Sequence, residues 1–212
     1  MDFEAERKRL INRLQSSHGE ISQRVFNAME RVPRHLFVSE NERYVAYGDY
    51  PLPIGCNQTI SAPHMVAIMC NLLELRPGHR VLEVGGGCGY HAAVMAELVR
   101  PGGHVFTIER VRALGELARE NLVATGYKDV TVIIEDGSGG LPGNAPFDRI
   151  SVACASPEIP EVLVQQLHLG GMMVIPVGKY MQELYLVTRT NGTKKEAKGG
   201  VVFVPLLGKY GF

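Results

Sequence analysis

The sequence predicts an α/β protein in which a doubly wound, mostly parallel sheet of about seven strands ends in an antiparallel hairpin and is preceded by a helical extension. Three observations support this fold class. From Arg80 onward, short β-rich runs alternate with helical stretches, which is typical of βαβ units. The last two β-rich runs have no helix between them and flank Asn191-Gly192, a strong hairpin signal. Before Arg80 the pattern is helical and then irregular.

The N-terminal part, residues 1–75, is expected to form helices and a covering segment within a single domain spanning residues 1–212. Apolar residues at helical spacing predict two helices, and Pro33 ends the second. These helices are Asp2–Leu14 and Ser22–Glu30.

Between Arg34 and Thr59 the periodicity fades, and an irregular segment of this length more often covers a functional site than serves as a spacer. A third helix is then expected to run to about Leu75, with Ser61 as its N-cap and Pro63 in its first turn.

Residues 76–212 are expected to supply the sheet. Seven runs rich in β-branched and apolar residues predict strands, and three helical stretches separate the first five of them. The predicted strands are Val81–Val84, His104–Glu109, Val130–Glu135, Phe147–Ala153, Met172–Val177, Glu183–Thr190 and Gly200–Leu206. The predicted helices are Tyr90–Arg100, Arg112–Thr125 and Pro160–Leu167.

Composition narrows the classes of function. The 212 residues carry 22 basic and 22 acidic side chains, so the basic surface typical of nucleic-acid binding is not expected. No apolar run approaches the length of a membrane helix, and the N-terminus has no apolar signal region. The four widely spaced cysteines favour free buried thiols over disulfides or a metal site. We therefore expect a cytoplasmic protein that binds no nucleic acid, membrane or metal. We also predict a monomer, although the composition does not determine the oligomeric state.

A glycine loop follows the first strand of the alternating region and precedes a helix. Gly85, Gly87 and Gly89 form the pattern G-x-G-x-G, whereas the dinucleotide fingerprint needs a glycine where Tyr90 stands. Glu83, just before the loop, would repel a pyrophosphate and attract a cationic ligand. These residues favour a nucleoside with positive charge over a nicotinamide dinucleotide.

Acidic residues also end the next two strands. Glu109 comes twenty residues after Gly89, a position from which a carboxylate accepts hydrogen bonds from both ribose hydroxyls. Asp136-Gly137 follows the third strand and is expected beside the adenine, although Asp136 as a simple turn cap is the alternative. Ligands of open α/β sheets bind at the carboxyl ends of the strands. A sulfonium nucleoside, S-adenosylmethionine, fits this set of acidic residues.

Beyond the glycine loop, the chain resembles the protein-L-isoaspartate (D-aspartate) O-methyltransferase family over nearly its whole length. The segment Gln58–Met65 (QTISAPHM) is specific to that family, whereas the glycine loop is shared by methyltransferases at large. The other matching segments are Leu82–Gly85, Ile108-Glu109, Asp136-Gly137, Leu169–Gly171, Ile175–Gly178 and Val202–Leu206.

The resemblance implies a fold of the S-adenosylmethionine-dependent methyltransferase type and a repair activity. Family members methylate the free α-carboxylate of L-isoaspartyl and D-aspartyl residues in damaged proteins and peptides. The methyl ester then closes to a succinimide, whose hydrolysis returns part of it to L-aspartate. The resemblance implies that Ser61 is the active-site side chain. It also places Thr59, Ile60, Ala62, His64 and Val204 around the substrate.

Three other functions stay open at this point. A methyltransferase of another small carboxylate or hydroxyl compound would use the same cofactor residues. A silent cofactor-binding scaffold would not need Ser61, and a nicotinamide oxidoreductase is disfavoured by Tyr90. Ser61 itself has a purely structural alternative, the N-cap role.

Overall fold

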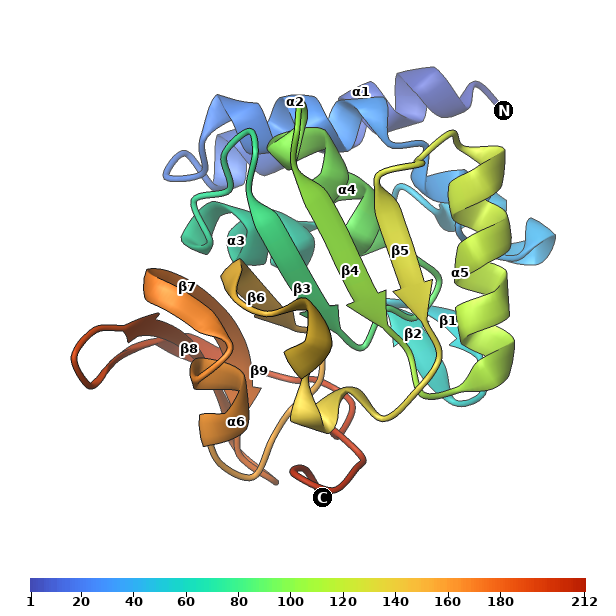
Figure 1. Ribbon diagram of the computed structural model, residues 1–212. Helices are drawn as coiled ribbons and strands as arrows, with labels where there is room; N and C mark the ends of the chain where they lie inside the picture. Colours follow the sequence, from blue (N-terminus) through green and yellow to red (C-terminus); the bar gives the residue numbers. More distant parts are fainter.

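The computed structural model describes residues 1–212 and contains a seven-stranded sheet and a separate two-stranded sheet (Figure 1). The first five strands of the large sheet are parallel and the last two antiparallel, as the sequence predicts. In spatial order they are β5 (Val130–Ile133), β4 (His104–Ile108), β3 (Arg80–Val84), β6 (Phe147–Val152), β7 (Leu167–Val177), β8 (Gln182–Arg189) and β9 (Thr193–Val201).

The C-terminal hairpin forms as predicted at Asn191-Gly192, where Arg189 pairs with Thr193. The position of its second strand was wrong, because β9 is the charged run Thr193–Val201 and not Gly200–Leu206. A charged strand is stable there because β9 is the edge of the sheet, where charges also prevent pairing with other chains. The apolar residues after Val201 leave the sheet, and Pro205 bridges to Ala155 instead.

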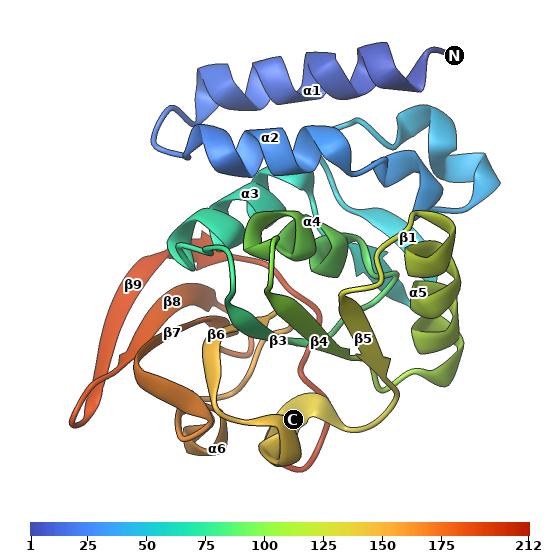
Figure 2. The same ribbon diagram turned by 45° about the horizontal axis from the view of Figure 1, so that its top comes forward.

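Helices cover both faces of the large sheet (Figure 1). Helices α3 and α4 lie on one sheet face, α2 lies on them and α1 lies on α2, whereas α6 lies on the other face of the sheet (Figure 2). The predicted third helix ends earlier than expected, and the helix before β7 is short. The helices are α1 (Phe3–Ser17), α2 (Gln23–Arg31), α3 (Pro63–Leu72), α4 (Tyr90–Val99), α5 (Arg112–Ala124) and α6 (Glu161–Val164).

The apolar sequence of α4 follows from its position between layers. Every residue of this helix except Glu97 is buried, as expected of a helix that is hydrophobic on all sides. One continuous core of 39 buried residues joins α1, α2 and α3 to α4 and to the face of the sheet beneath them. The N-terminal part and the sheet therefore share a single core.

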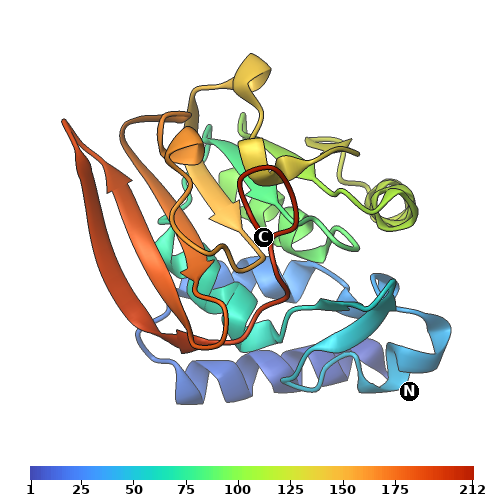
Figure 3. The same ribbon diagram turned by 90° about the horizontal axis from the view of Figure 1, so that it is seen from below.

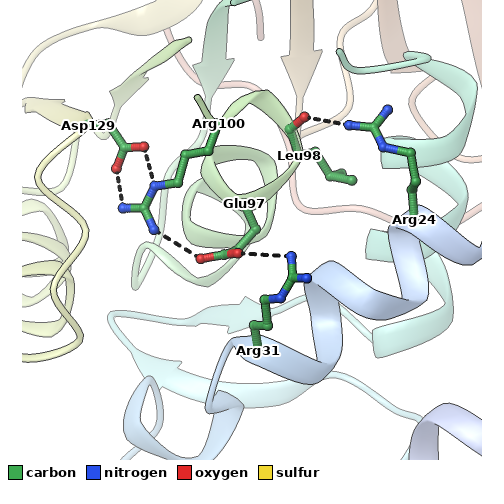
Figure 4. Close-up of polar contacts among 6 residues, drawn as sticks. All are labelled: Arg24, Arg31, Glu97, Leu98, Arg100 and Asp129. Atoms are coloured by element: carbon green, nitrogen blue, oxygen red, sulfur yellow. Dashed lines mark hydrogen bonds and ion pairs between the residues drawn. The ribbon is translucent and has the colours of Figure 1, made fainter. Parts of the chain in front are cut away.

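A network of charged side chains fixes this layer from outside (Figure 4). Arg24 of α2 donates to the carbonyl oxygens of Leu75 and Leu98, both at 2.9 Å. Glu97 of α4 lies between Arg31 (3.5 Å) and Arg100 (3.0 Å). Arg100 also binds both carboxylate oxygens of Asp129, at 2.5 and 2.6 Å, so the network reaches the loop before β5.

The segment predicted to be irregular contains a small hairpin, β1 (Leu52–Gly55) and β2 (Gln58–Ile60). Its turn places Cys56 and Asn57 in the left-handed region, with φ of 53° and 58°. Two 3₁₀ turns, Arg34–Leu36 and Glu40–Val45, precede it. Cys56 is exposed, contrary to expectation, because it sits at the tip of this turn; Cys70, Cys88 and Cys154 are free and buried as expected.

None of the helices combines the length and apolar character needed to cross a membrane.

Candidate active site

The candidate site lies at the carboxyl edge of the parallel strands, where the strand order reverses between β3 and β6. The C-terminal segment crosses this edge toward the short 3₁₀ turn Gly137–Gly139 (Figure 3). A pocket opens there between the ends of four strands, the β1–β2 hairpin and the C-terminal segment. Its lining comprises Gln58, Thr59, Val84, Gly85, Gly87, Ile108, Glu109, Arg110, Val111, Gly137, Ala153, Cys154 and Val204–Leu207.

The three glycines of the loop adopt positive φ, as the sequence pattern predicts: 88° at Gly85, 53° at Gly87 and 87° at Gly89. Gly85 and Gly87 line the pocket. Gly89 does not; it is the N-cap of α4, and a Cβ there would lie 3.2 Å from Leu122. A Cβ on Gly87 would lie 3.1 Å from Ile54, so the hairpin covers the loop closely. The covering segment is thus Leu52–Ile60.

Glu109 is the acid with the most direct access to the pocket. Its side chain is 7% exposed and lines the cavity. One carboxylate oxygen accepts the N–H of Gly87 at 2.9 Å and the other accepts the N–H of Val111 at 2.8 Å. Each oxygen keeps a further lone pair for a ligand. Glu109 therefore braces the glycine loop and offers an acceptor to the cavity.

Glu83 is placed differently from the expectation. It is fully buried on the helical face of the sheet and does not line the main pocket. Its Oε2 accepts the hydroxyl of Thr107 at 2.6 Å, and its Oε1 lies 3.2 Å from Nδ1 of His91. It borders only a small cavity beneath Gly85–Gly87. The carboxylate lies under the loop, not beside a ligand in the pocket.

Asp136 and Gly137, predicted together as cofactor residues, differ in their relation to the pocket. Gly137 lines the pocket, and a Cβ there would lie 3.0 Å from Val84 and 3.2 Å from Ile108, so glycine is required for close packing. Asp136 is outside the lining; it accepts the N–H groups of Ser138 and Lys209, both at 2.9 Å. Burial alone would raise the pKa of Asp136, but these hydrogen bonds outweigh it and lower the pKa. The alternative role, a turn cap, is what the geometry shows.

A second groove of about 910 Å³ adjoins the pocket and shares Thr59, Ala153 and Val204 with it. Ser61, Ala62 and His64 line this groove, whereas Ile60 faces the small cavity beneath the loop. Three of the most exposed apolar side chains, Tyr180, Met181 and Val202, border it as well. The structure therefore gathers all the predicted substrate residues except Ile60 beside the pocket that contains Gly85, Gly87, Glu109 and Gly137.

The predicted capping role of Ser61 was wrong. Ala62 is the N-cap of α3, and the Ser61 hydroxyl makes no hydrogen bond within the protein. The start of α3 also offers no N–H from Pro63, and the carboxylate of Asp49 accepts the N–H of His64 at 2.9 Å. The same oxygen of Asp49 lies 2.9 Å from Nδ1 of His64.

Val204 lines the pocket and the groove and has a backbone donor without a partner in the protein. Its carbonyl oxygen accepts the N–H of Ala155 at 2.8 Å, but its own N–H has no partner. The neighbouring Phe203 is held by the side-chain amide of Gln182, which donates to its carbonyl oxygen and accepts its N–H. Gln182 thus holds the backbone of Phe203, whereas the N–H of Val204 stays available to a ligand.

Two features of the site escaped sequence reasoning. Ala153 lines both the pocket and the groove; its position after β6, at the reversal of strand order, is a signal that would have found it. Tyr180 and Met181 carry no such signal. Tyr90, which stands where the dinucleotide fingerprint needs a glycine, is 2% exposed and packs in the N-terminal layer, edge-on to Phe37 with Arg34 over its ring.

Comparison with known proteins agrees with this geometry. The model of the protein-L-isoaspartate(D-aspartate) O-methyltransferase family matches residues 5–211. A protein-L-isoaspartate O-methyltransferase of Methanothrix thermoacetophila is 58% identical over 97% of both chains. Protein-L-isoaspartate O-methyltransferase 1 of Archaeoglobus fulgidus is 56% identical over 100% of this chain and 98% of its own.

A solved structure is similar over the same length. It was assigned as a protein-L-isoaspartate O-methyltransferase of Plasmodium falciparum and contains S-adenosyl-L-homocysteine. It superimposes with a TM-score of 0.83 at 30% identity, over 94% of this chain and 97% of its own. The range that the family model matches includes the glycine loop, the strand-end acids and the segment around Ser61. The chain belongs to the protein-L-isoaspartate(D-aspartate) O-methyltransferase family.

Proposed function

We propose that this protein transfers a methyl group from S-adenosylmethionine to the free α-carboxylate of L-isoaspartyl and D-aspartyl residues in damaged proteins and peptides. The observation that carries the proposal is the adjacency of two cavities at one sheet edge. A pocket bears a carboxylate and glycines, and the adjoining larger groove bears a hydroxyl without a protein partner. The two share Thr59, Ala153 and Val204. A donor and an acceptor bound there would meet at these shared residues.

The residues of the pocket suit an adenosyl group. Glu109 has acceptor capacity left for two ribose hydroxyls, because each of its oxygens holds only one backbone N–H. Gly85 and Gly87 permit close approach of a ligand to the backbone. Apolar side chains, among them Ile108, Val111 and Leu206, offer surface to an adenine ring.

We assign the acceptor carboxylate to Ser61 and Val204. The Ser61 hydroxyl and the Val204 N–H both lack protein partners, and both residues line the groove. Together they offer two donors to one carboxylate. Thr59, Ala62 and His64 would form its walls, with His64 held in place by Asp49, whereas Ile60 faces the small cavity beneath the glycine loop.

Beyond binding and orienting the two reactants, the methyl transfer requires little of the protein. S-adenosylmethionine supplies an activated methyl group. The acceptor carboxyl has a pKa of about 4 and is already ionised at neutral pH, so no general base is needed. The two donors orient one carboxylate oxygen toward the shared residues, at about 3–3.5 Å from the reacting carbon. Succinimide closure then follows without the protein.

We further propose that residues 1–75 and 76–212 act as one methyltransferase domain. The shared core of 39 buried residues and the contact of the β1–β2 hairpin with Gly87 support a single domain. Removal of the N-terminal part would expose α4 on the side that α1 and α2 cover.

The decisive assay compares an isoaspartyl peptide with its aspartyl twin in the presence of labelled S-adenosylmethionine. A normal aspartyl side chain holds its carboxylate at a different distance from the backbone. A misplacement of about 1 Å costs on the order of a hundredfold in rate. We expect methylation of isoaspartyl peptides with varied flanking residues and about a hundredfold less of the aspartyl versions. A D-aspartyl peptide tests the second substrate.

The open groove favours a peptide over a small acid as the acceptor. Its 910 Å³ and its exposed apolar rim exceed what a single small carboxylate fills. Comparable rates on isoaspartyl peptide and on free dicarboxylic acids would favour a small-molecule methyltransferase instead.

A further inference from the structure

A chain of buried polar groups runs beneath the glycine loop. Glu83 on β3 lies between Thr107 on β4, whose hydroxyl it accepts at 2.6 Å, and His91 on α4, 3.2 Å from its Oε1. The other ring nitrogen of His91 lies 3.4 Å from Sγ of Cys70 on α3. All four residues are at most 8% exposed. No part of the proposed methyl transfer requires this arrangement.

These buried polar side chains lie directly under the backbone that lines the donor pocket. A Cβ on Gly86 would lie 2.2 Å from the Thr107 hydroxyl and 3.7 Å from Glu83. Glu83 and His91 border the small cavity beneath the loop. Gly85 and Gly87 line both this cavity and the donor pocket. Any net charge on the pair therefore acts on a ligand in that pocket.

A lone carboxylate at the position of Glu83 would be costly, because it is fully buried and hydrogen-bonded by a single hydroxyl. His91 is the one basic side chain in contact with it. The start of a helix ordinarily disfavours a cation, so the carboxylate explains why a histidine occupies the second position of α4. Burial would lower the pKa of His91, but Cys70 and Glu83 outweigh it and raise the pKa to about 10.

We infer that His91 is a positioning residue that offsets the charge of Glu83 and thereby sets the ratio of affinities for the sulfonium donor and its uncharged product. If Glu83 were unpaired, its charge would hold the sulfonium before the reaction and lose that attraction as the methyl group leaves. Such binding stabilises the bound donor more than the transition state. With His91 protonated, the two charges cancel at the ligand.

The test measures binding of S-adenosylmethionine and S-adenosylhomocysteine by calorimetry without any methyl acceptor. His91→Gln, measured at an alkaline pH at which Glu83 stays ionised without its partner, should shift the affinity ratio about tenfold toward the donor, as expected for unit charges roughly 10 Å apart at an effective dielectric near 20. Glu83→Gln should shift the ratio toward the product. The double variant should return to the wild-type ratio.

His104→Gln is a matched control. His104 begins β4 at the opposite end of the strand, where its ring contacts Thr131. Its replacement should leave the ratio unchanged. A ratio within about twofold of wild type in a folded His91→Gln variant would overturn the inference.

A second measurement does not depend on any variant folding. Nitrogen chemical shifts of the wild-type ring at pH 8 should show His91 protonated on both nitrogens, and a neutral ring would also overturn the inference. The inference rests on the proposed use of a sulfonium donor. A protein that binds neither ligand would contradict the proposed function, whereas one that binds both with unchanged ratios would contradict the inference alone.

Discussion

Replacing Glu109 by Ala tests the donor site at the residue whose contacts are best defined. The wild-type carboxylate accepts one backbone N–H on each oxygen, from Gly87 and from Val111, and is 7% exposed. A hydrogen bond to a charged group contributes roughly 1.5–3 kcal/mol. Because 1.4 kcal/mol is a factor of ten, loss of one such bond to the ribose should weaken S-adenosylmethionine binding about tenfold to 150-fold.

The variant also removes the brace on the glycine loop, and the assay must separate the two effects. Calorimetry with S-adenosylhomocysteine and its 2′-deoxy analogue does so as a double-mutant cycle. In the wild type the deoxy analogue should bind about tenfold more weakly. In Glu109→Ala the two compounds should bind almost equally, because the acceptor of the missing hydroxyl is gone.

The refuting result is a deoxy penalty of the same size in both proteins. Glu109 would then act on the ligand only through the loop. Glu116→Ala on the exposed surface of α5, where Glu116 contacts only Arg112 at 3.6 Å, is the matched control and should change neither affinity.

Three further predictions follow from other contacts. Ser61→Ala should lower kcat/KM on an isoaspartyl peptide about tenfold to a hundredfold, because one donor to a carboxylate is lost. The melting temperature should stay nearly unchanged because Ala62 is the N-cap, and a lower melting temperature with normal turnover would contradict this prediction. Arg100→Met should lower the free energy of unfolding by about 1–2 kcal/mol in urea titrations, because it removes a bidentate pair with Asp129, and no change would mean that the pair is inert. The raised pKa of His91 means that its contribution to stability is fully present below pH 6.5 and is lost as the pH rises toward about 10. Thermal melts of the wild type should therefore fall across this range more steeply than those of His91→Gln.

The parallel strands were predictable because they are buried on both faces. Val81–Val84 and Phe147–Ala153 are mostly apolar, and the structure places the corresponding strands within a residue or two. The last strand was not predictable in this way. An edge strand needs only one partner, so charged residues such as Lys194, Glu196 and Lys198 occupy β9 with their side chains in water.

The sequence contains a weak indication of the small hairpin over the glycine loop. Asn57 tolerates the left-handed conformation, and the residues around it alternate between buried and exposed. What the sequence does not contain is the reason for the fold of this segment, namely the contact of Ile54 with Gly87. That contact joins parts of the chain that only the tertiary structure brings together.

The position of Glu83 illustrates a second limit. Its place at the end of a strand was correct, but alternation along β3 puts it on the side of Val81, which faces the helices, and not on the side of Val84, which lines the pocket. The identity of its partner depends on α4 packing over that face. Strand-end position thus predicts the edge of the sheet, and residue parity predicts the side on which a carboxylate acts.

The acceptor site shows how a local signal is overruled by a distant residue. A serine before a proline-initiated helix ordinarily indicates a cap and free N–H groups for an anion. Here Asp49 occupies the helix terminus through His64 and leaves the Ser61 hydroxyl without a structural role. The second proposed donor, the N–H of Val204, comes from the far end of the chain. Its position depends on the Ala155–Pro205 bridge, so the proposed carboxylate site would be complete only after the C-terminal segment has docked across the sheet edge.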